Sequence, residues 1–401
     1  MTLVPPPALT GRERVRVAMG LGVPDRVPVF CQLAIGHYFL NATPPSFDIW
    51  FRSEGFADAL IELQRRYGFD GILVNLPGRD PDVESHIARI EQSAEGSVVR
   101  WKDGSSTRVP KDDNPHWTGP GGEHAHPAFE TLDPQDLWYV EPWDVTGITC
   151  PYRWGFEAGP RPPGAFFPPW HLDTLRAVLS RTRGQVSVHA EVFSPFSQFL
   201  DLLGYQAALL ALMDDPGKAA ACLERLTHGA VELACAQAGA GVDAVLISSA
   251  FAGDGFISPG HYREFVLPWE GRLVASVRER HPDVKVYTHT CGGIGDRLEL
   301  MLESGTQGID TLDPPPLGTV ELEDAVRTLK GRAFIKGNID PVHTLLHGDE
   351  AAVRDAVLHR LRVAAPGGGY ILSSACSVAP GVKPGHLELM TRLAVEYGRY
   401  R

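Results

Sequence analysis

Cysteine is scarce in this sequence, and no two cysteines form a Cys-x-x-Cys pair. Six cysteines are spread over 401 residues. This spacing argues against a disulfide framework, and we expect reduced thiols, as in a cytosolic enzyme. Two of the six, Cys291 and Cys376, are considered below as ligands. The other four are interpreted as ordinary buried thiols: Cys31, Cys150, Cys222 and Cys235.

Long hydrophobic runs are also missing. No apolar stretch approaches the roughly 20 residues that a membrane-spanning helix needs. The first residues, MTLVPPPALTGRERVRVAMGLG, lack the apolar core of a secretory signal. We therefore expect a cytoplasmic protein without a membrane partner.

Positive charge is in deficit. Lys and Arg number 37 against 49 Asp and Glu, which gives a formal net charge of −12. Nucleic acids and anionic membranes attract basic surfaces, so this balance argues against both as partners.

Several common catalytic and nucleotide-binding motifs are absent as well. The sequence contains no GxxxxGK[ST] phosphate loop, no strand-borne GxGxxG, no GxSxG elbow and no HExxH. The carboxylates are too scattered to indicate a glycosidase pair. An open doubly wound nucleotide-binding sheet, the second choice for the fold, is therefore disfavoured.

What recurs instead is a short apolar, β-branched run followed by a loop and a helical stretch. Nearly continuous apolar runs are typical of parallel strands that are buried on both faces. Eight units that alternate strand and helix predict an α/β fold, a (β/α)8 TIM barrel. The eight runs lie at 27–33, 71–76, 186–191, 244–249, 284–289, 308–313, 333–339 and 370–375.

One segment breaks this period. Residues 85–170 separate the second and third predicted strands and begin with a predicted β-hairpin around a Lys-Asp-Gly turn. We interpret the chain as one barrel domain over 1–401, with 85–170 as an insertion in a βα loop. Such a loop would lie at the carboxyl-end face, where it either roofs a site or serves packing or oligomerisation.

A candidate metal site follows the fifth predicted strand. In VKVYTHTCGGIGD, His289 and Cys291 are two residues apart, and residues so spaced on a strand share a face. Imidazole and thiolate together suit zinc. A core cysteine beside a hydrogen-bonded histidine explains this pair equally well, but Cys376 follows the last predicted strand and faces the same barrel mouth. Three ligands with one open position are typical of a catalytic zinc.

Other polar residues also end predicted strands. Glu191 and Asp313 are candidate catalytic groups, although a buried structural carboxylate is an equally good interpretation of Glu191. Candidate substrate contacts, all of which also occur as ordinary capping or turn residues, are His37, Tyr38, Asn338 and Asp340.

These motifs resemble the uroporphyrinogen decarboxylase superfamily, which also contains methylcobalamin:thiol methyltransferases. The matching stretches include GFDGILV, EVFSPFSQFLDLLGY, HTCGGIGDRLELMLESG, GNIDPVHTLLHGDEAAV and APGGGYILSSACSVAPGVKP. The resemblance implies a (β/α)8 barrel and covers nearly the whole chain outside the insertion.

Three departures separate the sequence from the decarboxylases of this family. VPVFCQLAIGHYFL has no arginine where they carry an arginine-rich segment. The second predicted strand ends in Val74, Asn75 and Leu76 without their aspartate, and Cys376 replaces a histidine. The resemblance therefore points to the methyltransferase branch, in which His289, Cys291 and Cys376 would bind Zn²⁺.

That resemblance implies a small-molecule methyl acceptor, a thiol or a related group, activated by zinc. The methyl donor would be a corrinoid, methylcobalamin, which would sit on a partner protein or arrive free, because no DxHxxG-like corrinoid-binding stretch is present. A porphyrinogen decarboxylase and a non-enzymatic barrel that binds a partner remain alternatives. The sequence leaves oligomerisation open.

Overall fold

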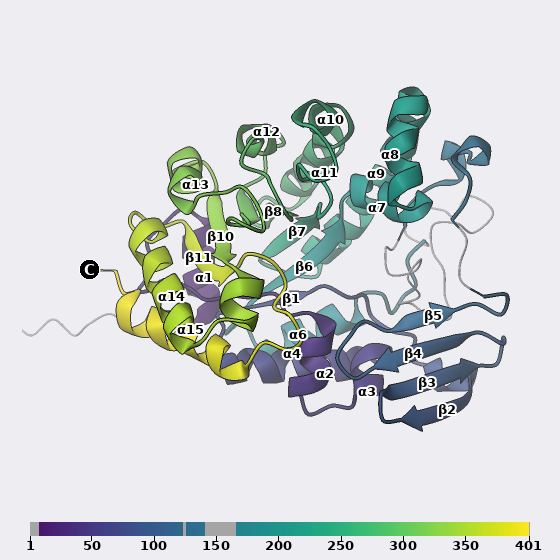
Figure 1. Ribbon diagram of the computed structural model, residues 1–401, viewed down its shortest axis with the longest axis horizontal. Helices are drawn as coiled ribbons and strands as arrows, with labels where there is room; N and C mark the ends of the chain where they lie inside the picture. Colours follow the sequence, from purple (N-terminus) through teal and green to yellow (C-terminus); the bar gives the residue numbers. More distant parts are fainter. Residues whose placement is uncertain (1–7, 123–125, 141–165, 401) are drawn as a thin grey trace, which may run out of the picture.

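In the computed structural model, residues 8–122, 126–140 and 166–400 are described, and their centre is a curled parallel sheet. Its strands run in the order β1-β6-β7-β8-β9-β10-β11, with all neighbours parallel. The fold is therefore α/β and fits a TIM-like barrel (Figure 1). The strands are β1 (Gly71–Val74), β6 (Ser187–Phe193), β7 (Ala244–Ser248), β8 (Lys285–Thr290), β9 (Gly308–Thr311), β10 (Phe334–Ile339) and β11 (Tyr370–Ser374).

The first predicted strand, 27–33, differs from expectation. It forms only isolated bridges, Val29 with Leu372 and Leu33 with Val378. Pro28 has no N–H to donate, and the N–H of Val29 donates to the Asp70 side chain at 2.8 Å instead of to a strand. The carbonyl of Val29 still accepts from the Asp70 N–H at 2.8 Å. This extended segment therefore lies between β11 and the start of β1 without being a regular strand.

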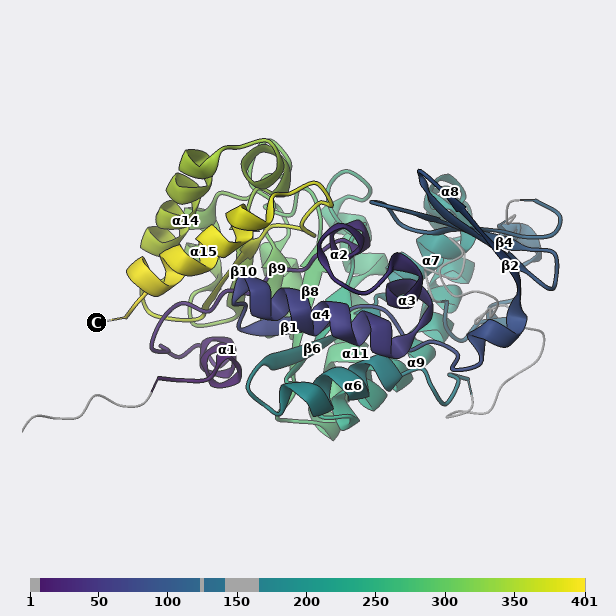
Figure 2. The same ribbon diagram turned by 90° about the horizontal axis from the view of Figure 1, so that it is seen from below.

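Helices cover the outside of the curled sheet, as the views in Figures 1 and 2 show. They begin and end at residues whose chemistry explains the boundary: Ser258 caps α10 through the His261 N–H, and Gly68 ends α4 with φ 66°. The outer helices are α2 (Ile35–Asn41), α3 (Ser46–Phe51), α4 (Ser53–Tyr67), α6 (Asp173–Thr182), α7 (Pro195–Leu203), α8 (Tyr205–Asp214), α9 (Pro216–Gly239), α10 (Pro259–Phe265), α11 (Leu267–Arg280), α12 (Leu298–Glu303), α13 (Leu322–Leu329), α14 (Glu350–Ala364) and α15 (Pro384–Tyr397).

Helix α1 (Gly11–Met19) closes the amino end of the sheet. Its apolar side chains join an interior cluster with residues from β1, β7, β8, β10 and β11, among them Tyr287 and Phe334. Buried Arg14 fixes the helix, since it pairs with Asp70 and with Asp25 at 2.6 Å each. With this end filled, the carboxyl ends of the strands are left to form a site.

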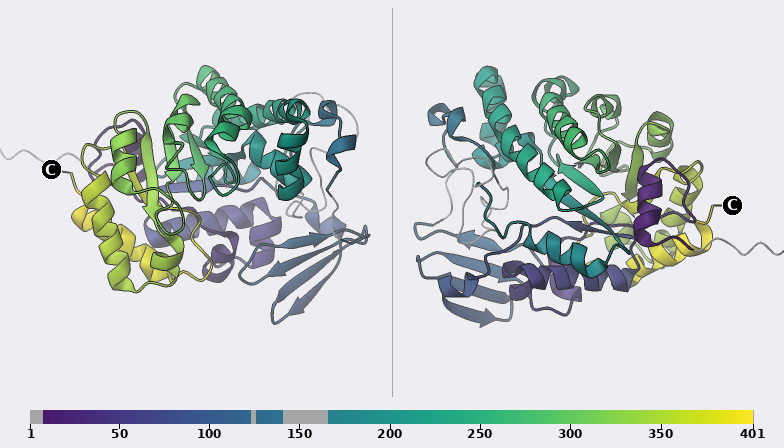
Figure 3. Two further views of the ribbon diagram at one scale, coloured as in Figure 1. Left: turned by 45° about the horizontal axis from the view of Figure 1, so that its top comes forward. Right: turned by 180° about the vertical axis from the view of Figure 1, so that it is seen from behind.

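A second sheet lies beside the barrel and comes from the segment between β1 and β6 (Figure 3). It is an antiparallel meander of four strands rather than the single hairpin expected, and the Lys-Asp-Gly turn joins its middle pair. Its strands are β2 (Ile87–Ser93), β3 (Gly96–Trp101), β4 (Ser106–Pro110) and β5 (His116–Thr118). Residues 123–125 and 141–165, with Cys150, lie outside the described residues.

Short helical turns complete the description. They are η1 (Val83–His86), η2 (Phe129–Thr131), η3 (Pro134–Asp136) and the π-helical turn η4 (Pro341–Leu346). Within the described ranges, no single helix is long and apolar enough to cross a membrane; the pair α7 and α8 reaches that length and composition only across a bend of 109°.

Candidate metal centre

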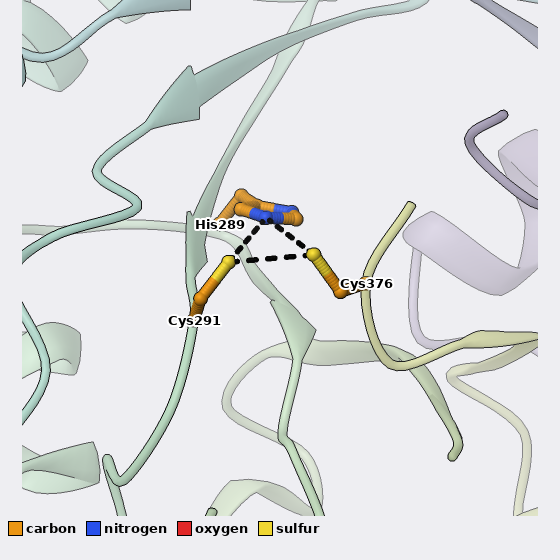
Figure 4. Close-up of side chains that lie close together, drawn as sticks. All are labelled: His289, Cys291 and Cys376. Atoms are coloured by element: carbon orange, nitrogen blue, oxygen red, sulfur yellow. Dashed lines mark hydrogen bonds between the residues drawn. The ribbon is translucent and has the colours of Figure 1, made fainter. Parts of the chain in front are cut away.

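His289, Cys291 and Cys376 converge at the carboxyl ends of the strands (Figure 4). His289 is on β8, Cys291 directly follows that strand, and Cys376 lies beyond β11. The Nε2 atom of His289 is 3.3 Å from Cys291 Sγ and 4.0 Å from Cys376 Sγ, and the two sulfurs are 3.4 Å apart. Among the described residues, this is the one cluster of His, Cys, Asp or Glu with metal-ligand spacing. The predicted ligand candidates are thus brought together.

The other nitrogen of the imidazole is held by an acidic side chain. His289 Nδ1 lies 3.1 Å from Asp310 Oδ2, and Asp310 also accepts from Lys336 Nζ at 3.0 and 3.1 Å. Burial favours the neutral acid, but Lys336 and His289 outweigh it and lower the pKa of Asp310. An ionised Asp310 holds a proton on Nδ1, which leaves Nε2 as the metal-binding atom.

Strand register explains this chain of contacts. His289 pairs with Asp310 across β8 and β9, and Asp310 pairs with Lys336 across β9 and β10. The three side chains therefore form one layer inside the sheet, and each is at most 5% exposed. Sequence reasoning missed Asp310 and Lys336; their inward positions on two predicted strands were the available signal.

The three side chains of the cluster shift one another's pKa values in different directions. The hydrogen bond from Cys291 and the neighbouring His289 lower the pKa of Cys376, while the same sulfur–sulfur hydrogen bond raises the pKa of Cys291. Burial opposes a charged imidazole, yet Asp310 and Cys376 raise the pKa of His289 to about 10. The imidazole of His289 and the thiol of Cys291 therefore keep their protons, and a thiophilic metal ion would displace them to gain one nitrogen and two sulfur ligands.

Glycines shape the loop that carries Cys291. Gly292 has φ 77°, in the left-handed region that favours glycine, and its N–H donates to Asp313 Oδ2 at 2.7 Å. Gly253, in the loop after β7, approaches so closely that a Cβ there would lie 2.5 Å from the carbonyl oxygen of Cys291. Backbone contacts on two sides therefore fix the position of this thiol.

The two candidate catalytic carboxylates differ in what they contact. Asp313 is 4% exposed and positions the loop through Gly292; burial raises its pKa to about 6. Glu191 on β6 is 9% exposed, and burial raises its pKa to about 7 against the opposing charge of His289. Glu191 is thus a carboxyl group within electrostatic range of the cluster that can change protonation near neutral pH.

The four candidate substrate contacts are not brought to the cluster together. His37 is fully buried, with Nε2 2.8 Å from the Tyr67 hydroxyl and Nδ1 3.2 Å from the Pro380 carbonyl, so both nitrogens serve packing. Asp340 caps η4 through the backbone N–H groups of Val342 and His343, which explains it as a turn residue.

The remaining two candidates occupy buried positions with different surroundings. Asn338 on β10 is 1% exposed and donates to the Leu312 carbonyl at 2.8 Å, while its Oδ1 has no hydrogen-bond partner among the described residues. Tyr38 lines a cavity together with Asn75, which follows β1, and with Trp50, which the sequence did not single out.

The fold and the cluster together define a barrel-like α/β protein with a nitrogen–sulfur donor set at the carboxyl ends of its strands. The family model for uroporphyrinogen decarboxylase matches residues 162–397, more than half of the chain. The chain belongs to the uroporphyrinogen decarboxylase family.

Individual relatives agree with this assignment. The chain is 31% identical over 175 residues to a uroporphyrinogen decarboxylase of Thioalkalivibrio sulfidiphilus, covering 43% of this chain and 47% of the relative. It is 30% identical over 194 residues to that of Azotobacter vinelandii, covering 47% of this chain and 52% of the relative. The alignments thus span about half the length of these curated relatives.

A solved structure has the same fold over almost the full length. It is described as a methyltransferase from Methanosarcina mazei, with a TM-score of 0.69 and 18% sequence identity, and the match covers 97% of this chain and 99% of that one. At this identity the likeness concerns the fold.

Proposed function

We propose that this protein is a zinc-dependent methyltransferase that moves a methyl group from a methyl-corrinoid, carried by a partner protein, to a thiol or related acceptor. The observation that carries the proposal is the triangle of His289 Nε2, Cys291 Sγ and Cys376 Sγ, in which Asp310 already holds the far side of the imidazole. The Methanosarcina neighbour, described as a methyltransferase, shares the fold.

The donor set fits zinc in type and number. One imidazole nitrogen and two thiolates are typical zinc ligands, and three protein ligands leave a position for an exogenous one. When bound there, zinc would lower the pKa of an acceptor thiol and keep it nucleophilic at neutral pH.

The chain's own residues would orient and tune this centre. Asp310 keeps the Nδ1 proton of His289 in place, and buried Lys336 keeps Asp310 ionised. Asp313 holds the loop of Cys291 through the Gly292 N–H. Glu191, with a pKa of about 7, is the group that would accept or return the acceptor's proton.

An aromatic rim offers a surface for a large flat donor. Tyr205, Phe251 and Phe256 pack against one another with ring centroids 4.9 to 6.0 Å apart, and Tyr205 and Phe256 are 46% and 42% exposed. The loop that carries Phe251 and Phe256 contacts the loop of Cys291, because the Asp254 N–H donates to the Gly293 carbonyl at 2.8 Å. This proximity supports a corrinoid approaching from that side.

Family membership gives a second candidate, a decarboxylase acting on a porphyrinogen-type substrate, because the relatives named above are uroporphyrinogen decarboxylases. The chain lacks an arginine in 27–40 and an acid at the end of β1, where Asn75 and Leu76 follow. A cluster of two thiols and an imidazole also serves no evident purpose in that reaction.

Two measurements on the purified protein test the proposal. Elemental analysis should find about one zinc per chain, and incubation with methylcobalamin and a thiol should convert the corrinoid spectrum to the demethylated form. Incubation with uroporphyrinogen should leave that substrate undepleted. Absence of zinc, or depletion of uroporphyrinogen without methyl transfer, would overturn the proposal in favour of the second candidate.

A further inference from the structure

Arg297 is a charged residue whose side chain is completely buried. It directly precedes α12, in the segment that connects Cys291 to this helix. Its carboxylate partner Asp296, at 2.8 and 3.2 Å, is 48% exposed, whereas the Arg297 side chain is 0% exposed. A buried ion pair contributes little net stability, because the loss of water offsets the attraction. The position of this cation therefore needs an explanation beyond stability.

The guanidinium group holds both ends of the loop that follows β7. Its Nη1 donates to the Ala252 carbonyl at 2.8 Å and to the Ile257 carbonyl at 3.0 Å. Between these ends the chain turns tightly, and the Ile257 N–H donates to the Gly253 carbonyl at 3.1 Å. The segment 252–257 is neither helix nor strand. Arg297 therefore joins the two ends of a loop that has no regular structure of its own.

The same loop lies against the backbone of Cys291. A Cβ at Gly253 would lie 2.5 Å from the Cys291 carbonyl oxygen, and the Asp254 N–H donates to the Gly293 carbonyl at 2.8 Å. Cys376 comes from a different segment, after β11. A displacement of the loop after β7 would therefore move Cys291 while leaving the segment of Cys376 in place.

The loop also carries two rings of the aromatic rim. Phe251 and Phe256 pack against each other with ring centroids 5.4 Å apart. The backbone of this loop thus contacts a candidate metal ligand, while its side chains form part of the surface proposed to receive the donor.

We propose that Arg297 is a positioning residue, which holds the loop after β7 against Cys291 so that this thiol and the aromatic rim keep a fixed relation to each other. This inference rests on the proposed function, in which the thiol binds zinc. Arg297 would act through the loop carbonyls that its guanidinium group bonds.

Chelator competition on the full-length protein measures the expected effect on zinc affinity. Arg297→Ala and Arg297→Lys should each bind zinc roughly 10-fold more weakly, as is typical when a group that orients a ligand is lost. Lysine keeps the charge but lacks the planar fork that bonds Asp296 and the loop at once. Arg263→Gln is the matched control and should keep wild-type affinity, because Arg263 is exposed and bonds Glu303 on α12 at 2.7 and 3.0 Å.

Two further measurements separate positioning from a general loss of stability. Leu60→Ala truncates a buried side chain of α4, so it should destabilise the protein and still bind zinc as tightly as wild type. Guanidinium ion, added far below denaturing concentration, should restore the zinc affinity of Arg297→Ala, since it offers the lost donors. Methylammonium at the same concentration should not.

Alkylation of the metal-free protein distinguishes failure of this inference from failure of the proposed function. In Arg297→Ala and Arg297→Lys, the ratio of Cys291 to Cys376 alkylation, read by peptide mass spectrometry, should rise several-fold, because only the backbone of Cys291 is released. That rise upholds the role of Arg297 even if wild type binds no zinc, in which case the proposed function alone fails. An unchanged ratio, an equal loss of zinc affinity in Leu60→Ala, or no rescue by guanidinium would overturn the role of Arg297.

Discussion

The side chains of His289 and Asp310 face each other across two neighbouring strands, with Nδ1 and Oδ2 3.1 Å apart, at paired positions of β8 and β9. Because the pairing is set by the sheet, the orientation of the imidazole is a property of the barrel and does not depend on a mobile loop. Lys336 extends the same layer to β10.

Replacing Asp310 with Asn should weaken metal binding roughly 10- to 100-fold, because the imidazole loses the group that orients it and raises its basicity. The same change leaves the buried Lys336 cation without its anion, which should lower the free energy of unfolding by roughly 3–5 kcal/mol. Chelator competition measures the first effect, and chemical denaturation measures the second.

The double variant Asp310→Asn with Lys336→Met separates these two roles. It removes the uncompensated charge, so most of the lost stability should return while metal affinity stays low. Recovery of full metal affinity in the double variant would show that Asp310 acts only through stability.

Replacing Cys376 with Ser should reduce bound zinc from about one per chain to a small fraction, since a neutral hydroxyl is a poor substitute for a thiolate ligand. Inductively coupled plasma analysis after dialysis gives the metal content. Cys235→Ser is the control, because Cys235 belongs to α9 and its Sγ faces the Ser276 carbonyl at 4.0 Å. An unchanged zinc content in Cys376→Ser would refute the metal centre.

Replacing Gly253 with Ala should lower metal affinity without touching a ligand. The new methyl group would lie 2.5 Å from the carbonyl oxygen of Cys291, so that backbone must shift and carry its thiol out of place. Gly255→Ala in the same loop is the matched control, since a Cβ there meets nothing within 4 Å. Equal metal affinities for the two variants would argue against tight positioning of Cys291.

Replacing Glu270 with Gln should remove a pH dependence of stability. Glu270 is 1% exposed, and burial raises its pKa from 4.5 to about 7. Between these pH values the folded state binds more protons than the unfolded state, so the free energy of unfolding falls as pH rises through that window. The loss, at most about 3 kcal/mol above pH 7, should be absent in Glu270→Gln.

Denaturation curves at pH 4.5 and pH 8 check this expectation. Wild type and Glu270→Gln should be similar at the acidic pH, where both side chains are neutral, and the variant should be more stable at pH 8. Glu264→Gln, exposed on α10, should follow wild type at both. If Glu270→Gln were less stable than wild type at pH 8, contacts in the folded state would have to favour the charged form of Glu270.

The sequence predicted the repeating units well because buried parallel strands leave a strong apolar signal. Seven of the eight runs are strands of one sheet. The exception, 27–33, has an equally apolar pattern. The pattern does not show that the Val29 N–H donates to the Asp70 carboxylate instead of to a neighbouring strand. Such a side-chain competitor is visible only once the two segments are side by side.

The ligand candidates were predictable for a similar reason: His289, Cys291 and Cys376 follow strands whose carboxyl ends must meet. Asp310 and Lys336 were not, because their roles depend on register between strands, which composition does not specify. His37 was predicted at the site because it follows the first apolar run. It lies instead within α2, where its ring bonds the Tyr67 hydroxyl. The cavity around Trp50 depends on contacts among five separate segments, which the sequence alone does not bring together.

The two cysteines of the cluster lie after β8 and after β11, at opposite ends of a run of four neighbouring strands. An ion held by both thiols would therefore cross-link the ends of β8 and β11, which the hydrogen bonds of the sheet do not join directly. Any local opening that separates these strand ends must first release the ion. The rate at which the ion exchanges with solution would then report the rate of this local opening. It could be measured in the native protein without denaturant.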